Sequence, residues 1–258
     1  MIKRRNVPFS FSAEDSDESE DSFGGFDPFT RAKIRRAAAA AAVAASEGDE
    51  AGDGAPAAEE EAKAPLDLDL TDHFLIAMPS MLDPIFGGTV VYLCEHNQNG
   101  ALGVVINKPT DMTMDVLLDR INLKLEIKPD TPDAMPEVYR RPVMFGGPVQ
   151  VERGFVLHST SDQFSSTLQV TDGIALTTSK DVLEAVAHGN GPARVLVSLG
   201  CSGWSAGQLE DELGRNGWLT VKADPAIIFE LPVEERFTAA LALLGIDPVM
   251  LSGDAGRA

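Results

Sequence analysis

The chain has 258 residues, 44% of them hydrophobic, which suits one medium-sized globular domain. Its formal net charge is −19, and such an excess of carboxylates opposes the phosphate contacts on which nucleic-acid binding depends. No segment approaches the roughly 20 apolar residues that span a bilayer, and the basic N-terminus lacks the apolar run of a secretory signal. We therefore expect a cytoplasmic protein that neither crosses nor binds a membrane.

Residues 1–66 differ from the rest of the sequence in composition. They hold 8 Lys and Arg against 14 Asp and Glu, almost no branched aliphatic residues, and several acidic or alanine-rich runs. Such a segment buries too little apolar surface to offset the entropy of the chain. We predict a disordered tail here and a globular domain at 67–258. The alternative for 31–45 is a basic, then alanine-rich helix that docks on a partner.

From Leu66 onward, short apolar runs alternate with turn residues. Strands are expected at 73–79, 88–96, 101–107, 142–146, 154–159, 173–178 and 193–199. The second and third should form a hairpin, because Asn99 and Gly100 tolerate the positive φ of a tight turn. Helices are expected at 114–121, 180–188, 206–214 and 232–245, the first three capped by Thr113, Ser179 and Ser205. The charged, proline-rich segment 124–141 reads as a loop. This order predicts an α+β domain with a mixed sheet.

Four blocks of sequence, in this order and spacing, resemble the YqgE/AlgH family of bacterial proteins. They begin with H-F-L-I-A-M-P, P-V-M-F-G-G-P, T-T-S-K-D and G-W-S-A-G-Q-L-E, and the resemblance covers residues 71–258. It implies a mixed, branched β-sheet that curls into a pseudo-barrel with flanking helices. It implies no established chemistry, because the family's AlgH name reflects only a proposed role in regulating alginate synthesis.

Two side chains are candidate nucleophiles. Residues 203–207 read G-W-S-A-G, the pattern in which flanking glycines expose a hydrolase serine, here Ser205. All four histidines precede it, whereas that fold places histidine last, so a helix cap is the simpler interpretation. Cys94 shares a strand face with Tyr92 and His96 by the two-residue period, where the imidazole could activate the thiol. Side chains two apart diverge, and a buried free cysteine commonly acts as a small hydrophobic residue.

A candidate ligand site is predicted where two strands end. Asn107 and Lys108 could bind an anion with help from Gly146, Gly147 and Arg153. In the alternative interpretation, Asn107 only satisfies buried main-chain groups where Pro109 stops the strand.

The usual motifs for nucleotides, metals and cofactors are missing from the sequence, so we expect no cofactor and no metal. Cys94 and Cys201 lack metal-ligand spacing and are expected to be reduced thiols. The predicted function is a non-catalytic binding or regulatory module for an unknown protein partner or small ligand, without direct nucleic-acid binding. The alternative is a small-molecule enzyme that uses Cys94 or Ser205 in a site that the sequence does not reveal.

Overall fold

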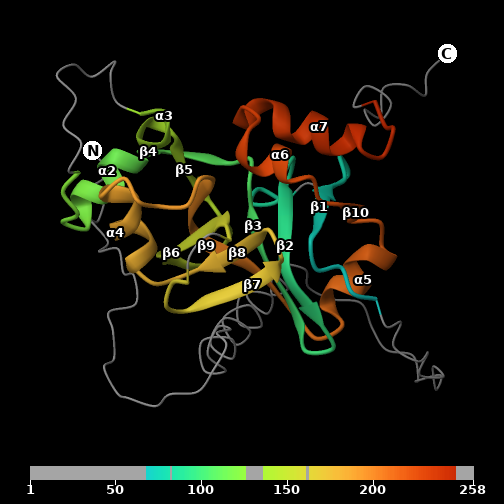
Figure 1. Cartoon of the computed structure of the whole chain (residues 1–258). Coiled ribbons are helices and arrows are strands. Elements are labelled where there is room, and N and C mark those ends of the chain that lie inside the picture. The colour runs from blue at the N-terminus through green and yellow to red at the C-terminus, as the bar shows by residue number, and fades with distance from the viewer. Residues whose placement is uncertain (1–67, 82, 126–135, 161–162, 248–258) are drawn as a thin grey trace, which may run out of the picture.

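The computed structural model describes residues 68–81, 83–125, 136–160 and 163–247, so the predicted tail at 1–66 lies outside the described residues (Figure 1). Ten strands form one sheet that curls into a half-barrel. They are β1 (His73–Ala77), β2 (Val90–Asn97), β3 (Gly100–Val105), β4 (Pro109–Thr113), β5 (Pro142–Phe145), β6 (Val149–Ser159), β7 (Thr167–Thr171), β8 (Ile174–Thr177), β9 (Val195–Ser205) and β10 (Trp218–Lys222).

The sheet is mixed and branched, as the resemblance implied. Its main path runs β10-β1-β2-β3-β9-β6-β8-β7 in antiparallel pairs, whereas β4 and β5 lie off this path. The branch point is β9, because its C-terminal half pairs with β3 and its N-terminal half pairs in parallel with β5. Gly200, with φ 73°, separates the two halves, a conformation that glycine adopts at no steric cost.

Short helices flank the sheet on several sides (Figure 1). They are α2 (Met114–Arg120), α3 (Glu137–Arg140), α4 (Asp181–Ala187), α5 (Gln208–Gly214), α6 (Pro225–Phe229) and α7 (Arg236–Ala242), with a 3-10 turn, η2 (Val233–Glu235), before α7. Among the described helices, none has the length and apolar character needed to cross a membrane.

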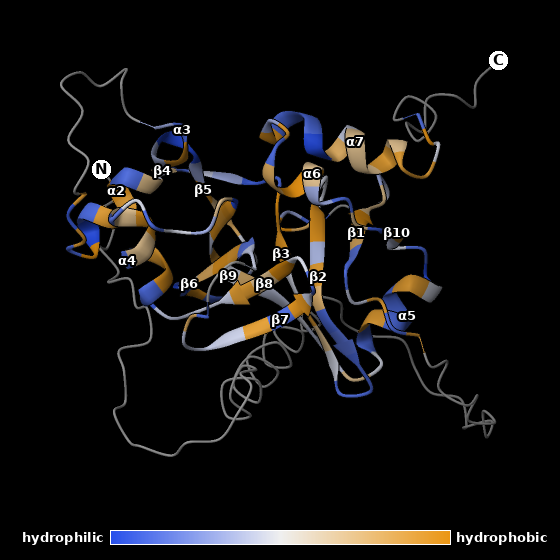
Figure 2. Cartoon of the chain, in the orientation of Figure 1, coloured by the Kyte–Doolittle hydropathy of each residue, from blue (hydrophilic) through white to orange (hydrophobic). Residues whose placement is uncertain are grey.

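Three apolar clusters hold these layers together. The largest fills the inside of the curl and includes Leu168 of β7, Cys94 of β2 and Leu241 of α7, although β2 and β7 are far apart in strand order. A second cluster lies under α2, α3 and α4, and a third under α5. Figure 2 shows apolar residues along β2, β3 and β8, and a hydrophilic tip on the β2–β3 hairpin.

The predicted hairpin is confirmed, but its turn differs in detail. Asn97 pairs with Gly100, so the turn residues are 98 and 99, and only Gly100 has a positive φ, of 121°. A Cβ on Gly100 would lie 2.2 Å from the carbonyl oxygen of Trp204. The glycine therefore permits the close approach of β3 to β9 as well as the turn.

Several boundaries differ from the sequence prediction. The strands β4, β7 and β10 and the helix α6 were not predicted, and the one-turn helix α3 forms inside the segment expected to be a loop; residues 126–135 of that segment lie outside the description. Helix α4 has Lys180 at its N-cap in place of Ser179, and Thr113 sits at the N-cap of α2 without a side-chain capping bond. The last predicted helix begins at Arg236, because residues 233–235 form the 3-10 turn.

Candidate functional site

Ser205 ends β9 and is held by an amide side chain. Its main-chain N–H and its hydroxyl both donate to Oε1 of Gln208, at 3.0 and 3.1 Å. The N-cap of α5 is Gly207, with φ 79° and no side-chain capping bond, so the prediction that Ser205 caps this helix is wrong. An amide oxygen accepts a hydrogen bond but does not take up the proton, so Gln208 cannot serve as the general base that a serine nucleophile needs.

The rest of this motif forms a structural network around Glu212. Its Oε2 atom accepts hydrogen bonds from the indole nitrogens of Trp204 and Trp218, at 2.9 and 2.7 Å. Its Oε1 atom accepts one from Nε2 of Gln208, at 3.0 Å. Sequence reasoning missed this network, although Gln208 and Glu212 are four residues apart, the spacing that aligns side chains along one helix face.

Cys94 lies at a β-bulge, which overturns the predicted alignment with His96. The pairing of β2 with β3 shifts between Leu93 and Glu95, and the extra residue reverses the alternation of side chains beyond it. Cys94 therefore packs in the largest cluster, whereas Ala101, the cross-strand partner of His96, belongs to the cluster under α5. Burial raises the pKa of the Cys94 thiol well above its ordinary value, which disfavours the thiolate.

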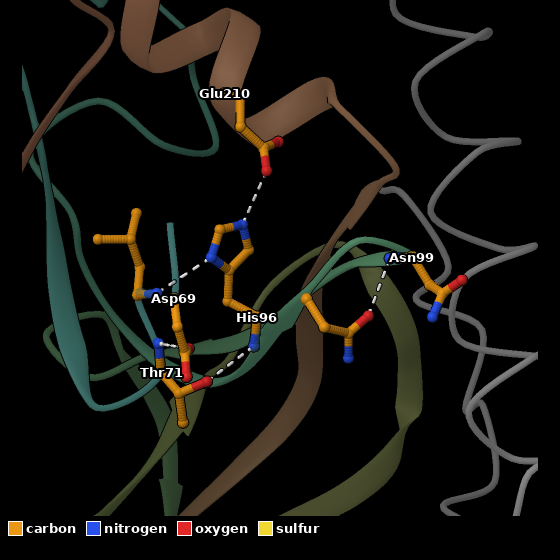
Figure 3. A network of polar contacts seen from close by, with 7 residues as sticks. Asp69, Thr71, His96, Asn99 and Glu210 are labelled. Carbon is orange, nitrogen blue, oxygen red and sulfur yellow. Dashed lines mark hydrogen bonds and ion pairs between the residues drawn. The ribbon is translucent and has the colours of Figure 1, made fainter. Parts of the chain in front are cut away.

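The imidazole of His96 anchors the segment that enters β1 (Figure 3). Its Nδ1 accepts the main-chain N–H of Leu70 at 3.1 Å, so the proton resides on Nε2, which donates to Oε1 of Glu210 at 3.0 Å. The main-chain N–H of His96 donates to the hydroxyl of Thr71 at 3.0 Å. Both ring nitrogens are thus engaged in holding the entry segment and α5 against β2.

In the predicted anion site, the side chains of Asn107 and Lys108 already bind main-chain groups. Asn107 accepts from the N–H of Val90 at 2.8 Å and donates to the carbonyl of Gly88 at 2.9 Å. The ammonium of Lys108 donates to the carbonyls of Pro84, at 3.3 Å, and of Ile85. These bonds fasten the loop before β2, as the alternative interpretation of Asn107 proposed.

The other three members of that site lie in two places. The carbonyl of Lys108 accepts from Phe145, which brings its main chain beside Gly146. A Cβ on Gly146 would lie 2.2 Å from the carbonyl oxygen of Gly200, and one on Gly147 would lie 2.4 Å from the main chain of Cys201. Arg153 instead points to Thr178, whose hydroxyl accepts from it at 3.0 Å. Anion binding by the five residues together stays a prediction.

A pocket of about 450 Å³ opens between the α3–β5 segment and the α6–α7 segment, which lie on facing sides of the upper edge in Figure 1. Its volume is in the range of small-molecule sites. Most of its lining is apolar, supplied by Pro109, Met114, Val138, Pro142, Met144, Val195, Leu196, Val197, Phe229, Leu231, Pro232 and Val233. Its charged residues are Glu137, Arg140, Arg141, Glu230, Glu234 and Arg236.

Arg236 is the one charged lining residue that is buried, with 6% of its surface exposed. Its Nε donates to the carbonyl of Leu231 at 3.1 Å and its Nη1 to the carbonyl of Ile106 at 2.5 Å. Sequence analysis did not single it out, although an arginine beside the apolar run F-T-A-A-L-A-L-L is the kind of residue that marks a polar contact inside a core.

Within the part of the chain that the structure describes, no group of three or more His, Cys, Asp or Glu side chains could hold a metal ion. The two cysteines are both buried and free.

Comparison with known proteins places this architecture in a family. The branched half-barrel sheet with its flanking helices is the fold of AlgH-like proteins, and the model of the AlgH-like family, DUF179, matches residues 74–249. The chain belongs to this family, as the resemblance of its sequence blocks indicated. A UPF0301 protein of Ralstonia nicotianae is 62% identical over 191 residues, which cover 74% of this chain and 96% of that protein. A UPF0301 protein of Cupriavidus pinatubonensis is 62% identical over 197 residues, covering 76% and 100%.

Two solved structures are similar. The solution structure of the AlgH protein from Pseudomonas aeruginosa has a TM-score of 0.58 and 47% identity, covering 77% of this chain and all of that one. The crystal structure of protein DIP2367 from Corynebacterium diphtheriae has a TM-score of 0.52 at 15% identity, covering 67% and 85%, a likeness of fold alone. The family's function is not established.

Proposed function

We propose that the chain is a non-catalytic binding module, and that a small molecule with an apolar body occupies the pocket between α3 and α6. The pocket itself carries this proposal, because it combines a volume of about 450 Å³ with an apolar lining and one buried cationic group. Binding sites for small molecules have this character: mostly apolar walls with a few placed polar groups that fix orientation.

The proposal that catalysis is absent is supported by the surroundings of both candidate nucleophiles. The Cys94 thiol is fully buried and bonded only weakly, to the carbonyl of Tyr92 with a sulfur–oxygen distance of 3.7 Å. The Ser205 hydroxyl donates to an amide. Neither contact supplies a base that could generate a nucleophile.

Reactive probes should therefore leave both residues unmodified in the folded protein. We expect no fluorophosphonate adduct on Ser205 and no iodoacetamide adduct on Cys94 within an hour, because the first lacks a base and the second is shielded and protonated. Peptide mapping by mass spectrometry measures this. As a control, iodoacetamide in guanidinium chloride should label both Cys94 and Cys201. A stoichiometric Ser205 adduct in the folded protein, lost in Ser205→Ala, would establish an enzyme.

Direct binding to DNA is not expected. Residues 67–258 hold 13 Lys and Arg against 26 Asp and Glu, a formal charge of −13, and duplex DNA repels such a surface. Fluorescence anisotropy with a labelled duplex should show no binding at physiological salt. A submicromolar affinity that falls steeply as salt rises would contradict this expectation, since that dependence reports counterion release.

The proposed function is tested by methyl NMR with a library of small compounds of mixed charge. A genuine ligand should shift the methyl signals of Met144, Leu231 and Val233, which line the pocket, and leave those of Val151 and Leu243 unchanged. The latter two are the matched controls, because they are exposed apolar side chains that do not line the pocket. If no compound of any charge shifts the pocket methyls, or if the shifts spread evenly over both sets, the proposed function is wrong.

A further inference from the structure

We infer that the ligand of this pocket is a monocarboxylate with an apolar body, whose carboxylate is bound by Arg236 and Arg141. This inference rests on the proposed function and names the class of molecule that the pocket selects.

The first argument is that Arg236 is a buried charge that no carboxylate of the described residues contacts directly. Within the described part of the chain, its hydrogen bonds end on the main-chain carbonyls of Leu231 and Ile106, and it makes no ion pair with a carboxylate. A guanidinium has five N–H donors in a planar fork, so two carbonyl bonds leave donors available on the side of the pocket that it lines. Carbonyl dipoles satisfy hydrogen bonds but carry no net charge to offset the cost of burying a cation.

The second argument is that another guanidinium lines the same pocket. Arg141 donates from Nη1 to the carbonyl of Phe229 at 2.9 Å, and its Nη2 lies 3.4 Å from the exposed carboxylate of Glu137. Burial, and then the charge of Arg141, lower the pKa of Arg236 to about 10, although the charge of Glu234 raises it, so Arg236 remains protonated at neutral pH. Two cations that line one pocket repel each other, and an anion placed between them relieves that repulsion.

The third argument concerns the charge of the ligand and its apolar part. Glu137, Glu230 and Glu234 are exposed residues of the lining, and three carboxylates around the pocket oppose a doubly charged phosphate more strongly than a singly charged acid. Guanidinium forks bind planar carboxylates in a bidentate manner. The half-buried apolar side chains of Val138, Leu231 and Val233 offer the surface for a hydrocarbon body. The volume fits a free small molecule better than a folded partner.

The test compares four probes that share one hydrocarbon chain: octanoate, 1-octanol, octylammonium and octyl phosphate. Each is titrated into the full chain while the methyl signals of Met144, Leu231 and Val233 are followed. We expect octanoate to bind with the highest affinity, about ten- to a hundredfold above octanol. This ratio corresponds to about 1.4 to 2.8 kcal/mol, which is what two hydrogen bonds to charged groups contribute beyond two neutral ones. Octyl phosphate should bind no better than octanoate, and octylammonium should not shift these signals.

Two variants test which side chains bind the carboxylate of octanoate. Arg236→Gln and Arg141→Gln should each weaken octanoate at least tenfold and leave octanol unchanged. Arg215→Gln, an equal charge change at the exposed end of α5 outside the pocket, is the control and should not alter either affinity. Arg236 also binds the carbonyls of Leu231, before η2, and Ile106, after β3, so its variant is first checked for an unchanged amide spectrum. If this variant fails to fold, the half-exposed Arg141 carries the test alone.

The outcomes separate the two proposals. If octanol binds at the pocket methyls as tightly as octanoate, or if Arg141→Gln leaves octanoate affinity unchanged, the carboxylate inference is wrong while the pocket remains a binding site. If octyl phosphate binds more tightly than octanoate, the ligand class is a phosphate and the inference is also wrong. If neither these probes nor the mixed library reaches the pocket methyls, the proposed function itself fails.

Discussion

Replacing Glu212 with alanine should lower the free energy of unfolding by about 3 to 5 kcal/mol. One carboxylate oxygen accepts both indole N–H groups, and the alanine variant would leave the two buried donors of Trp204 and Trp218 without this acceptor. Each hydrogen bond to a charged group contributes about 1.5 to 3 kcal/mol, and an orphaned buried donor carries its own desolvation cost. Guanidinium chloride unfolding followed by far-UV circular dichroism measures the change.

The matched control is Glu212→Gln. A glutamine oxygen can still accept from both indoles, so the expected loss is smaller, about 1 to 2 kcal/mol. It comes from the missing charge and from the hydrogen bond to Gln208, which is lost because the new amide nitrogen faces the Nε2 donor. The chain has two tryptophans and both contact Glu212, so tryptophan fluorescence of the folded variants reports on this site directly. Equal stability of the alanine and glutamine variants would show that the carboxylate oxygen is not what holds the indoles.

Gly146→Ala should cost at least about 3 kcal/mol, enough to unfold a marginally stable domain. The new Cβ would lie 2.2 Å from the carbonyl oxygen of Gly200 and 2.8 Å from the hydroxyl of Ser198. The Gly200 carbonyl lies in the middle of β9, and its neighbours Leu199 and Cys201 both pair with β6, which limits how far it can move. Overpacking against main chain costs more than overpacking against a flexible side chain. Thermal unfolding with an independent denaturant titration measures the loss.

Gly173→Ala provides the comparison at a glycine with open space. No atom lies within 4 Å of a Cβ at this position, between β7 and β8, and its φ is not positive. The change should leave stability within about 1 kcal/mol, because alanine also restricts the unfolded chain. If Gly146→Ala were as stable as Gly173→Ala, the tight packing of β5 on β9 would be contradicted, and Gly146 would again be open to a role in ligand binding.

The strands with long apolar runs could be predicted from the sequence, because burial on both faces leaves a continuous signal. The strand β4 could not, since P-T-D-M-T carries little strand character and becomes a strand through its pairing with β5. The branch in the sheet could not be predicted from the residues of its strands either. It depends on β9 having different partners along its two halves, and a strand's own residues do not encode its partners.

The site was harder to predict than the fold for the same reason. The bulge at Cys94 moves His96 to the opposite face of β2, and no residue in V-V-Y-L-C-E-H-N signals that extra residue. Asn107 and Gly146, at two strand ends, were predicted to belong to a ligand site. In the structure Asn107 holds the loop before β2, and Gly146 allows a close approach to β9. Arg141 and Arg236 line one pocket only because the fold brings together segments that are far apart in the sequence.

A crystal structure of the protein grown with octanoate tests the central claim most directly. The account predicts octanoate in the pocket between α3 and α6, with its carboxylate oxygens within hydrogen-bonding distance of the guanidinium groups of Arg236 and Arg141. Its chain should lie against Leu231 and Val233. Octanoate bound elsewhere on the molecule, or bound in the pocket with its carboxylate turned away from both arginines, would contradict it.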